Sequence, residues 1–434
     1  MDHENYVNWF RHSSPYINAH RNKTFVLLLP GEGIAGDNFA NIVHDIALLN
    51  SLGVRLVIVH GIRPQLEALL AERKQESHCH QGVRVTDADA LDCATAVTGN
   101  VRSKIEAWFS MGLPNSPMHL SSIRVCSGNF IVARPLGIHD GVDYQFTGEV
   151  RRVDVDAINQ QLALGATVLL SPLGYSPTGE VFNLLAEEVA TEVAAAIGAD
   201  KLILFSDQDG ILDDRGQLIR ELSLSQASYQ YEQHGKIISD HLLASAINAS
   251  QAGVERCHII SHQQDGALIE ELFTRDGCGS LVFQDSYESI RTAAIDDVGG
   301  ILELIQPLEE QGILVRRSRE LLEREIEQFT VIERDGAIIA CAALYPFVKE
   351  RCAELACVVT HADYRGHSRG EKLLASLEKQ ARSQGLDTLF VLTTQTSHWF
   401  MEQGFMEGEL DNLPARRQSM YNFQRNSRVL FKSL

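Results

Sequence analysis

Short apolar runs alternate with amphipathic stretches over the first two-thirds of the chain. The segment Thr24–Leu29 reads TFVLLL, and residues 54–59 read VRLVIV. Between them, apolar side chains recur at helical spacing over residues 38–52, and Gly53 marks the end of the predicted helix. Strands without polar alternation that are joined by a helix are typical of a parallel sheet covered on both faces.

The same alternation continues to about residue 284. Further strands are predicted at residues 166–170, 201–205 and 257–260, and further helices at 183–197 and 237–252. Shorter runs containing Gly and Pro at residues 121–146 predict a hairpin region at one edge of the sheet. We therefore expect an α/β domain with an open, mostly parallel sheet sandwiched by helices.

The pattern changes at residues 284–292, and a second unit of α+β type is expected beyond this point. The pattern predicts helices over 298–311 and after Arg319, strands over 329–334, 337–347 and 353–359, a helix over 371–384 and a strand over 388–393. Asp335-Gly336 is a typical hairpin turn between the first two of these strands. The predicted domains are residues 1–287 and 288–434.

Charge is distributed unevenly between these two parts. The whole chain has a formal net charge of −19. Residues 1–290 contain 20 Lys and Arg against 36 Asp and Glu, whereas the remainder contains 18 against 21. An acidic chain argues against nucleic acid as a partner, because nucleic-acid binding requires a basic face. The contrast between the parts indicates ligands of different charge.

Cysteine usage and hydropathy bear on metals and location. None of the eight cysteines forms a CxxC pair. The cluster His78-Cys79-His80 lacks a second ligand pair at zinc-finger spacing, so a polar loop is favoured over a metal site and no metal is expected. The N-terminal residues are polar and acidic, and no run of ~18 apolar residues exists. We expect a cytoplasmic protein without a membrane segment and with reduced thiols.

A predicted strand, a basic turn and a predicted helix follow one another at residues 358–374. A helix N-terminus with free main-chain N–H groups favours phosphate, and a basic surface turn is the alternative. The sequence resembles the acetyl-CoA motif of the GNAT acyltransferases, with Ser368 in place of the middle glycine. The resemblance implies that acetyl-CoA is bound by Val358, Val359, Arg365, Gly366, His367, Ser368, Arg369 and Gly370.

The same resemblance implies where the chemistry occurs. In this family the strand before the turn parts from its neighbour, and its main chain aligns the thioester, which points to Cys357 and Val358. Glu354 precedes Val358 by four residues and is a candidate base for the acceptor ammonium, directly or through water, the alternative being a solvent-facing glutamate. Many relatives have a tyrosine as thiolate proton donor at the position of Phe400, so protonation here requires another donor, or the thiolate (thiol pKa ~8.5) leaves unassisted.

Arginines gather at three places in the C-terminal part. Because a guanidinium grips carboxylates with two hydrogen bonds, several such groups favour a dicarboxylate acceptor, although each alone is commonly solvated. The three groups are Arg316, Arg317 and Arg319, then Arg416 and Arg417, then Arg425 and Arg428.

The N-terminal part resembles the amino-acid kinase fold, and within it acetylglutamate kinase. The resemblance rests on residues 25–32, 59–65, 84–87, 183–187 and 199–203. Leu28 and Pro30 stand where such kinases have a catalytic lysine and the first glycine, and no lysine stands near Leu242, where a second is expected. Phosphoryl transfer depends on these cations, so we predict that the domain has no kinase activity.

A regulatory role is the remaining expectation for this domain. Arginine-sensitive acetylglutamate kinases share the segment Pro15-Tyr16-Ile17 and a Glu-Leu-Phe segment followed by glycines, here residues 271–279. Gly266 stands where the family has a histidine, and ordinary packing is the alternative for Tyr16 and His258. The resemblance implies an L-arginine site formed by Tyr16, Lys201, His258, Glu271 and Gly277.

A kinase-like domain without activity, followed by a GNAT domain, resembles the bacterial N-acetylglutamate synthases over nearly the whole chain. The family implies acetyl transfer from acetyl-CoA to the α-amine of L-glutamate by direct attack in a ternary complex, feedback inhibition by L-arginine and a homo-hexamer. It also implies that Arg316, Arg425 and Ser427 hold the glutamate carboxylates. The alternatives are an enzyme with a working kinase half, a non-catalytic arginine sensor, and an acetyltransferase for another amine.

Overall fold

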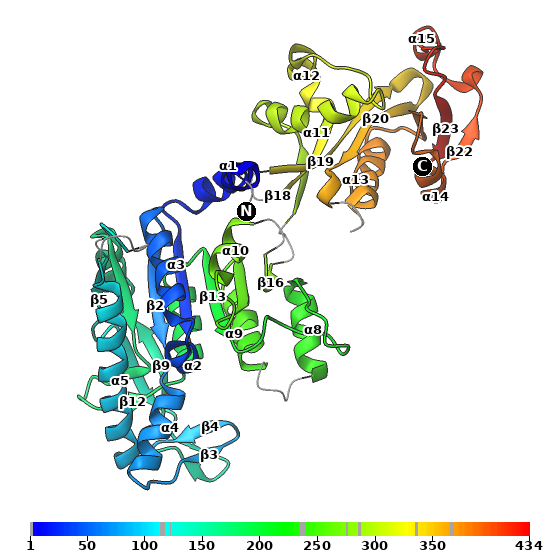
Figure 1. Cartoon of the computed structure of the whole chain (residues 1–434). Coiled ribbons are helices and arrows are strands. Elements are labelled where there is room, and N and C mark those ends of the chain that lie inside the picture. The colour runs from blue at the N-terminus through cyan, green and yellow to red at the C-terminus, as the bar shows by residue number, and fades with distance from the viewer. Residues whose placement is uncertain are drawn as a thin grey trace. The chain divides into compact units, whose positions relative to one another are not determined.

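The structure is a computed structural model of the whole chain. The residues that it describes are 3–112, 118–121, 123–234, 240–274, 277–284, 288–334, 337–364 and 369–434. The chain divides into two compact units, Met1–Asp285 and Ser286–Leu434 (Figure 1).

The first unit is built on an eight-stranded sheet with the strand order β14-β16-β15-β13-β1-β2-β10-β5. Neighbouring strands are parallel, except that β15 and β16 are antiparallel. The strands are β1 (Thr24–Leu29), β2 (Arg55–His60), β5 (Arg124–Cys126), β10 (Ala166–Leu170), β13 (Lys201–Ser206), β14 (Glu221–Ser223), β15 (Arg256–Ser261) and β16 (Ser280–Phe283). A second sheet has the order β12-β11-β6-β9, with β6 (Ile131–Pro135), β9 (Gly148–Val153), β11 (Leu173–Tyr175) and β12 (Val181–Asn183).

Helices cover both faces of the large sheet. Alternate residues of a strand point to opposite faces, so Phe25 and Leu27 of β1 pack into one core and Val26 and Leu28 into another. The first core includes residues of α3, α5 and α10, and the second includes residues of α7 and α9. The main helices are α1 (His3–His20), α3 (Phe39–Ser51), α4 (Arg63–Glu72), α5 (Ala88–Phe109), α6 (Val155–Ala163), α7 (Ala186–Ala196), α8 (Leu224–His234), α9 (Asp240–Gln251) and α10 (Ala267–Phe273). The expected sandwich is confirmed.

Two local expectations for this unit need correction. The helix expected from residue 183 begins at Ala186, because Asn183 ends strand β12 and its buried amide donates a hydrogen bond to Thr86 Oγ1 at 3.1 Å. The long helix α5 was not anticipated from the sequence pattern. It begins after Asp87, whose side chain accepts a hydrogen bond from the main-chain N–H of Ala90.

The second unit is a seven-stranded sheet with the order β17-β18-β19-β20-β21-β23-β22. Only the neighbours β20 and β21 are parallel within the described residues. Residues of α11 (Val298–Glu310) and α12 (Arg319–Glu325) pack against one face, and residues of α13 (Arg369–Ser383) against the other (Figure 1). The strands are β17 (Ser289–Thr292), β18 (Phe329–Arg334), β19 (Ala337–Phe347), β20 (Cys352–Thr360), β21 (Thr388–Thr393), β22 (Met406–Gly408) and β23 (Arg428–Ser433). The expected α+β unit is confirmed.

Membrane-spanning helices and metal-binding clusters are both absent from the described residues. None of the helices there has the length and apolar character needed to cross a membrane. No group of three or more His, Cys, Asp or Glu side chains in those residues is arranged to hold a metal ion.

Candidate active site and regulatory site

Strand β20 contains a bulge at Cys357. Cys341 of β19 is paired with Val359, but Ala343 is paired with Ala356, so β20 has one more residue than β19 between these pairs. Cys357 has a φ of +51°, in the left-handed region that non-glycine residues rarely occupy. Such a conformation costs about 1–3 kcal/mol and is typical of functional sites.

Two residues before the bulge residue Cys357, the pairing of β20 with β21 ends. The parallel pairing runs from Cys352–Thr388 to Leu355–Val391 and stops there, although β20 continues to Thr360. On the side facing β21, the main chain after Leu355 therefore has no strand partner in the described residues. This is where the family resemblance places the thioester of acetyl-CoA.

Glu354 lies three residues before Cys357 on β20 and forms an ion pair. Its side chain is 12% exposed, so it is not the solvent-facing glutamate that the sequence left open. Arg417 of α15 (Ala415–Gln418) donates from Nε to Oε2 at 2.6 Å and from Nη2 to Oε1 at 2.9 Å. Tyr345 is its direct cross-strand neighbour on β19, so the two side chains share one face of the sheet.

The thiol of Cys357 is on that same face, within the core formed by α11 and α12. Burial raises its pKa to about 11, although nearby Arg317 acts in the opposite direction. The thiol therefore stays protonated near neutral pH, and a protonated thiol is a poor nucleophile. These properties argue against Cys357 as a nucleophile, and the main-chain conformation is what distinguishes this position.

The segments that carry Arg316 and Arg425 lie side by side. Arg425 Nη2 donates a hydrogen bond to the carbonyl of Ile313 at 2.7 Å, three residues before Arg316, whose side chain is exposed. The carbonyl of Ser427 accepts a hydrogen bond from the hydroxyl of Tyr421 at 2.7 Å. The structure thus brings together the chain segments of the residues expected to hold glutamate.

The expected acetyl-CoA turn is described only in part. Arg365, Gly366, His367 and Ser368 lie outside the described residues. Arg369 begins α13, and its guanidinium is buried against Glu288 Oε1, with hydrogen bonds of 2.8 and 2.5 Å, and against the carbonyl of Tyr364 at 3.1 Å. Its side-chain charge is thus neutralised inside the protein, which leaves its main chain at the helix N-terminus for a phosphate contact. Val358 packs toward α13, whereas Val359 is buried on the opposite face.

Gly370 and Phe400 are explained by packing beside this turn. A Cβ atom at Gly370 would lie 3.0 Å from Cζ2 of Trp399, so a larger residue would require the ring to move. Phe400 is 3% exposed in the core beneath α13 and has no group that could donate a proton.

In the first unit, Lys201, His258 and Glu271 form a buried chain of hydrogen bonds. His258 Nδ1 lies 2.6 Å from Glu271 Oε1, and His258 Nε2 lies 3.2 Å from Lys201 Nζ. The other carboxylate oxygen of Glu271 accepts hydrogen bonds from the main-chain N–H groups of Cys278 and Gly279, each at 2.9 Å. The family resemblance assigned the three side chains to one site, and the structure brings them into contact.

The pKa values of these groups define the charge of the cluster. Burial opposes ionisation of Glu271, but the hydrogen bonds from His258 and the two main-chain N–H groups lower its pKa to about 2. Burial and the charge of Lys201 lower the pKa of His258 to about 4. Burial and Arg256 lower the pKa of Lys201 to about 7. At neutral pH, a neutral His258 therefore donates from Nδ1 to the Glu271 carboxylate.

Gly277 lies directly against Glu271 of this cluster, whereas Tyr16 lies on helix α1. Gly277 has a φ of +60°, and a Cβ atom there would clash with Oε2 of Glu271, so the position requires glycine. Tyr16 is half-buried on α1, which is fastened to α10 by hydrogen bonds from His20 Nε2 to the carbonyl of Leu272 and from Ser13 Oγ to that of Phe273.

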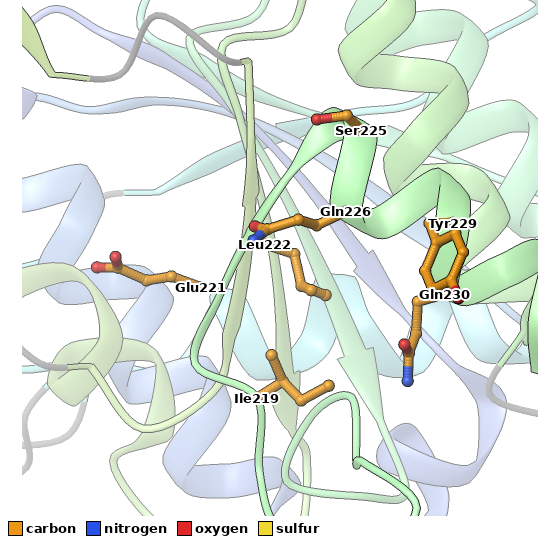
Figure 2. A pocket seen from close by; sticks show the side chains of 7 residues that line it. All are labelled: Ile219, Glu221, Leu222, Ser225, Gln226, Tyr229 and Gln230. Atoms are coloured by element: carbon orange, nitrogen blue, oxygen red, sulfur yellow. The ribbon is translucent and has the colours of Figure 1, made fainter. Parts of the chain in front are cut away.

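The first unit also has a surface pocket that these sites do not use. Its volume is about 430 Å³, and Figure 2 shows side chains that line it from α8 and from the segment that contains β14. Glu221 is the one charged side chain among those that line it, so the pocket offers no cation to a phosphate. The lining residues are Ile219, Glu221, Leu222, Ser225, Gln226, Tyr229 and Gln230.

Comparison with known proteins agrees with both parts of this description. Residues 23–261 match the amino acid kinase family, and residues 300–405 match the acetyltransferase (GNAT) family. The amino-acid acetyltransferase of Ectopseudomonas mendocina is 58% identical over 429 residues, which cover 99% of each chain. The chain belongs to the amino-acid acetyltransferases. The corresponding enzyme of Azotobacter vinelandii is 57% identical with the same coverage.

Solved structures extend the comparison to ligands. The crystal structure of N-acetylglutamate synthase from Neisseria gonorrhoeae complexed with coenzyme A and L-arginine matches this acetyltransferase with a TM-score of 0.90 and 38% identity, over 99% of each chain. A structure of the same protein complexed with coenzyme A and N-acetyl-glutamate has a TM-score of 0.64 and 39% identity over the same shares. The expected resemblance, the GNAT domain and acetyl-CoA as co-substrate are confirmed.

The sequence did not identify the partners of the candidate residues. Arg417 was noticed only as part of an arginine pair, and Glu288 was not singled out. Tyr345 could have been found from the predicted hairpin, because antiparallel pairing sets residues of 337–347 opposite those of 353–359. Arg417 and Glu354 are 63 residues apart, and no local pattern connects them.

Proposed function

We propose that this acetyltransferase transfers the acetyl group of acetyl-CoA to the α-amine of L-glutamate and is inhibited by L-arginine. The observation that carries the proposal is the position of Glu354, which lies beside the bulge where β20 parts from β21, on the face shared with Tyr345. Arg316 and Arg425, whose segments are in contact with each other, are the proposed partners of the two carboxylates. Support also comes from the relative whose structure contains N-acetyl-glutamate.

The proposed reaction begins with a proton transfer. Glu354 accepts a proton from the α-ammonium of the acceptor, directly or through one water, and the neutral amine then attacks the thioester carbonyl carbon. Main-chain N–H groups beside the bulge at Cys357 and Val358 would donate to the developing oxyanion. The C–S bond then breaks, and coenzyme A leaves as a thiolate. The attacking nitrogen loses its second proton, which reaches the thiolate through solvent, because Phe400 has none to give, and Glu354 then releases its own proton to solvent.

The proposed arginine site is the cluster of Lys201, His258 and Glu271, with Tyr16 and Gly277. A buried carboxylate held ionised suits a guanidinium or ammonium group. The acidic composition of residues 1–290 favours a cationic ligand there. A relative of 38% identity contains L-arginine in its crystal structure. The homo-hexamer, the cytoplasmic location and the absence of kinase activity remain predictions.

A single assay tests the acceptor and the inhibitor together. Release of the coenzyme A thiol is measured with acetyl-CoA and L-glutamate, L-aspartate, L-glutamine or L-lysine, each with increasing L-arginine. We expect turnover to be fastest with L-glutamate and to fall as L-arginine rises. No thiol release with L-glutamate would refute the proposed acceptor. Formation of ADP from ATP and N-acetylglutamate would instead support a working kinase half.

Arg425→Ala is expected to raise the KM for L-glutamate by about 10- to 100-fold, since it removes a charge-assisted contact to a carboxylate. The KM for acetyl-CoA should stay within about twofold of that of the unchanged enzyme. The matched control is Arg382→Ala, an exposed arginine on α13. An equal rise in both KM values would contradict the assigned role of Arg425.

Binding of L-arginine is expected to tighten as the pH rises from 6 to 8. Burial and Arg256 lower the pKa of Lys201 to about 7, so Lys201 carries its charge below that pH and competes with the ligand cation beside Glu271. Above pH 7 the competing charge is lost. Calorimetric titration at three pH values measures the effect, and Lys201→Met should remove most of the dependence. Weaker binding at pH 8 than at pH 6 would contradict the proposed cluster.

A further inference from the structure

We propose that Arg417 is a positioning residue for the acetyl transfer, which orients the Glu354 carboxylate toward the acceptor amine. The inference rests on the proposed function, because it takes Glu354 as the base. It assigns a role to an arginine for which the family motifs gave no role beyond membership of a basic pair.

The first support is the geometry of the ion pair. The ion pair is bidentate. Nε and Nη2 of Arg417 donate hydrogen bonds to the two different carboxylate oxygens of Glu354, at 2.6 and 2.9 Å. Two parallel hydrogen bonds fix the carboxylate plane as well as its distance, which a single ammonium contact cannot do.

The second support is that the Arg417 guanidinium also contacts the main chain around it. Arg417 Nη1 donates to the carbonyl of Met420 at 3.3 Å, and the neighbouring Gln418 donates through Nε2 to the carbonyls of Asp411 and Leu413 at 3.1 and 2.8 Å. The Gln418 contacts connect the short helix α15 to the loop before it, and the Met420 contact connects Arg417 to the segment after it. These main-chain contacts limit the movement of the Arg417 guanidinium, so its position does not depend on Glu354 alone.

The third support is burial. The side chains of Arg417 and Glu354 are 20% and 12% exposed. Ion pairs that are partly shielded from water are screened less than pairs on the open surface. The contact between Arg417 and Glu354 is therefore less exposed to competition from water and salt than a surface ion pair.

Pairing with Arg417 leaves Glu354 able to act. Each carboxylate oxygen has two lone-pair sites, and the fork uses one on each oxygen. The remaining sites can accept from the acceptor ammonium or from a bridging water. Tyr345 is opposite Glu354, but its hydroxyl lies 2.9 Å from Oε2 of Glu325, so it is already paired with another carboxylate.

The competing explanation is that Arg417 binds a substrate carboxylate directly. A substrate-binding arginine acts mainly on the KM for L-glutamate, whereas a positioning residue acts mainly on kcat. The two explanations therefore give different kinetic results for the same variant.

The test compares Arg417→Gln and Arg417→Lys with Arg351→Gln in the full chain. Arg351 forms an exposed ion pair with Asp387 in the same unit and serves as the matched control. Arg417→Gln is expected to lower kcat by about 10- to 100-fold with less than a threefold change in the KM for L-glutamate. Arg417→Lys, which keeps the charge but not the fork, should recover part of the loss, and the control should stay within twofold.

A double variant separates positioning from a merely structural role. If Arg417 acts through Glu354, adding Arg417→Gln to Glu354→Gln should lower kcat by less than about threefold further, because coupled residues are not additive. A full additional 10- to 100-fold loss would overturn the proposal. So would a raised KM with unchanged kcat, or wild-type kinetics in Arg417→Gln.

Two controls keep these results interpretable. Coenzyme A binding by each variant checks that the second unit is folded, and Arg417→Lys replaces Arg417→Gln if the latter fails this check. If the unchanged enzyme acetylates L-glutamate but Arg417→Gln is normal, only the present inference fails. If the unchanged enzyme does not acetylate L-glutamate, the proposed function itself fails.

Discussion

Glu354→Gln is expected to lower kcat by about 100- to 10,000-fold, the range typical of losing a general base. Glutamine keeps the size of the side chain and can still accept one hydrogen bond from Arg417, but it cannot accept a proton from an ammonium at neutral pH. The KM for acetyl-CoA should change little, because the cofactor turn and the bulge at Cys357 are unaffected. Steady-state kinetics with varied L-glutamate and acetyl-CoA measure both quantities.

The control for this variant is Glu407→Gln. Glu407 forms an exposed ion pair with Arg428 in the same unit, with side chains that are 59% and 61% exposed. It should leave kcat within about twofold, as surface ion pairs contribute little. If kcat for Glu354→Gln remained within threefold of the unchanged enzyme, Glu354 could not be the base, and the acceptor amine would have to reach the site already neutral.

Glu271→Gln is expected to weaken L-arginine binding by about 30-fold or more, since removing one charge of a buried pair costs about 2–5 kcal/mol. The carboxylate is held ionised by His258 and by the main-chain N–H groups of Cys278 and Gly279, and glutamine offers no charge to the ligand cation. Calorimetric titration with L-arginine, and the fraction of activity lost at saturating L-arginine, are the measurements.

Glutamine is a better replacement than alanine at this position. Alanine would leave the N–H groups of Cys278 and Gly279 without an acceptor in a nearly dry site, which would lower the stability of the first unit in addition to changing the ligand site. Glu270→Gln is the control, because Glu270 is the adjacent residue, is exposed, and accepts a hydrogen bond from Gln264 rather than from the cluster. Unchanged inhibition in Glu271→Gln would refute the proposed arginine site.

The sequence predicted the central strands of the large sheet, from β15 to β10, because burial on both faces leaves a direct signal. The runs at 24–29 and 166–170 coincide with β1 and β10, since every residue in them is buried and all but Thr24 and Thr167 are apolar. The pattern failed where polar side chains are buried for a specific partner. Asn183 is an example, because its amide is bonded to Thr86, 97 residues earlier in the chain.

Site residues could be named from family motifs, but their charge partners could not. Glu354 was chosen from its place on a strand, yet the guanidinium that pairs with it comes from a four-residue helix near the C-terminus. Arg369 was chosen as a cation for a phosphate, but its charge is paired with Glu288, 81 residues earlier. Such pairs depend on the folded positions of distant segments, which local spacing does not encode.

The bulge at Cys357 has a consequence for how two substrates share one strand. In a regular strand Glu354 and Val358, four residues apart, would point to the same side. The extra residue instead leaves Glu354 with Tyr345 on the α11 side and turns Val358 toward α13. In the proposed mechanism, β20 therefore separates the base, on one face, from a residue proposed to contact acetyl-CoA, on the other. This arrangement predicts that L-glutamate and acetyl-CoA can bind in either order.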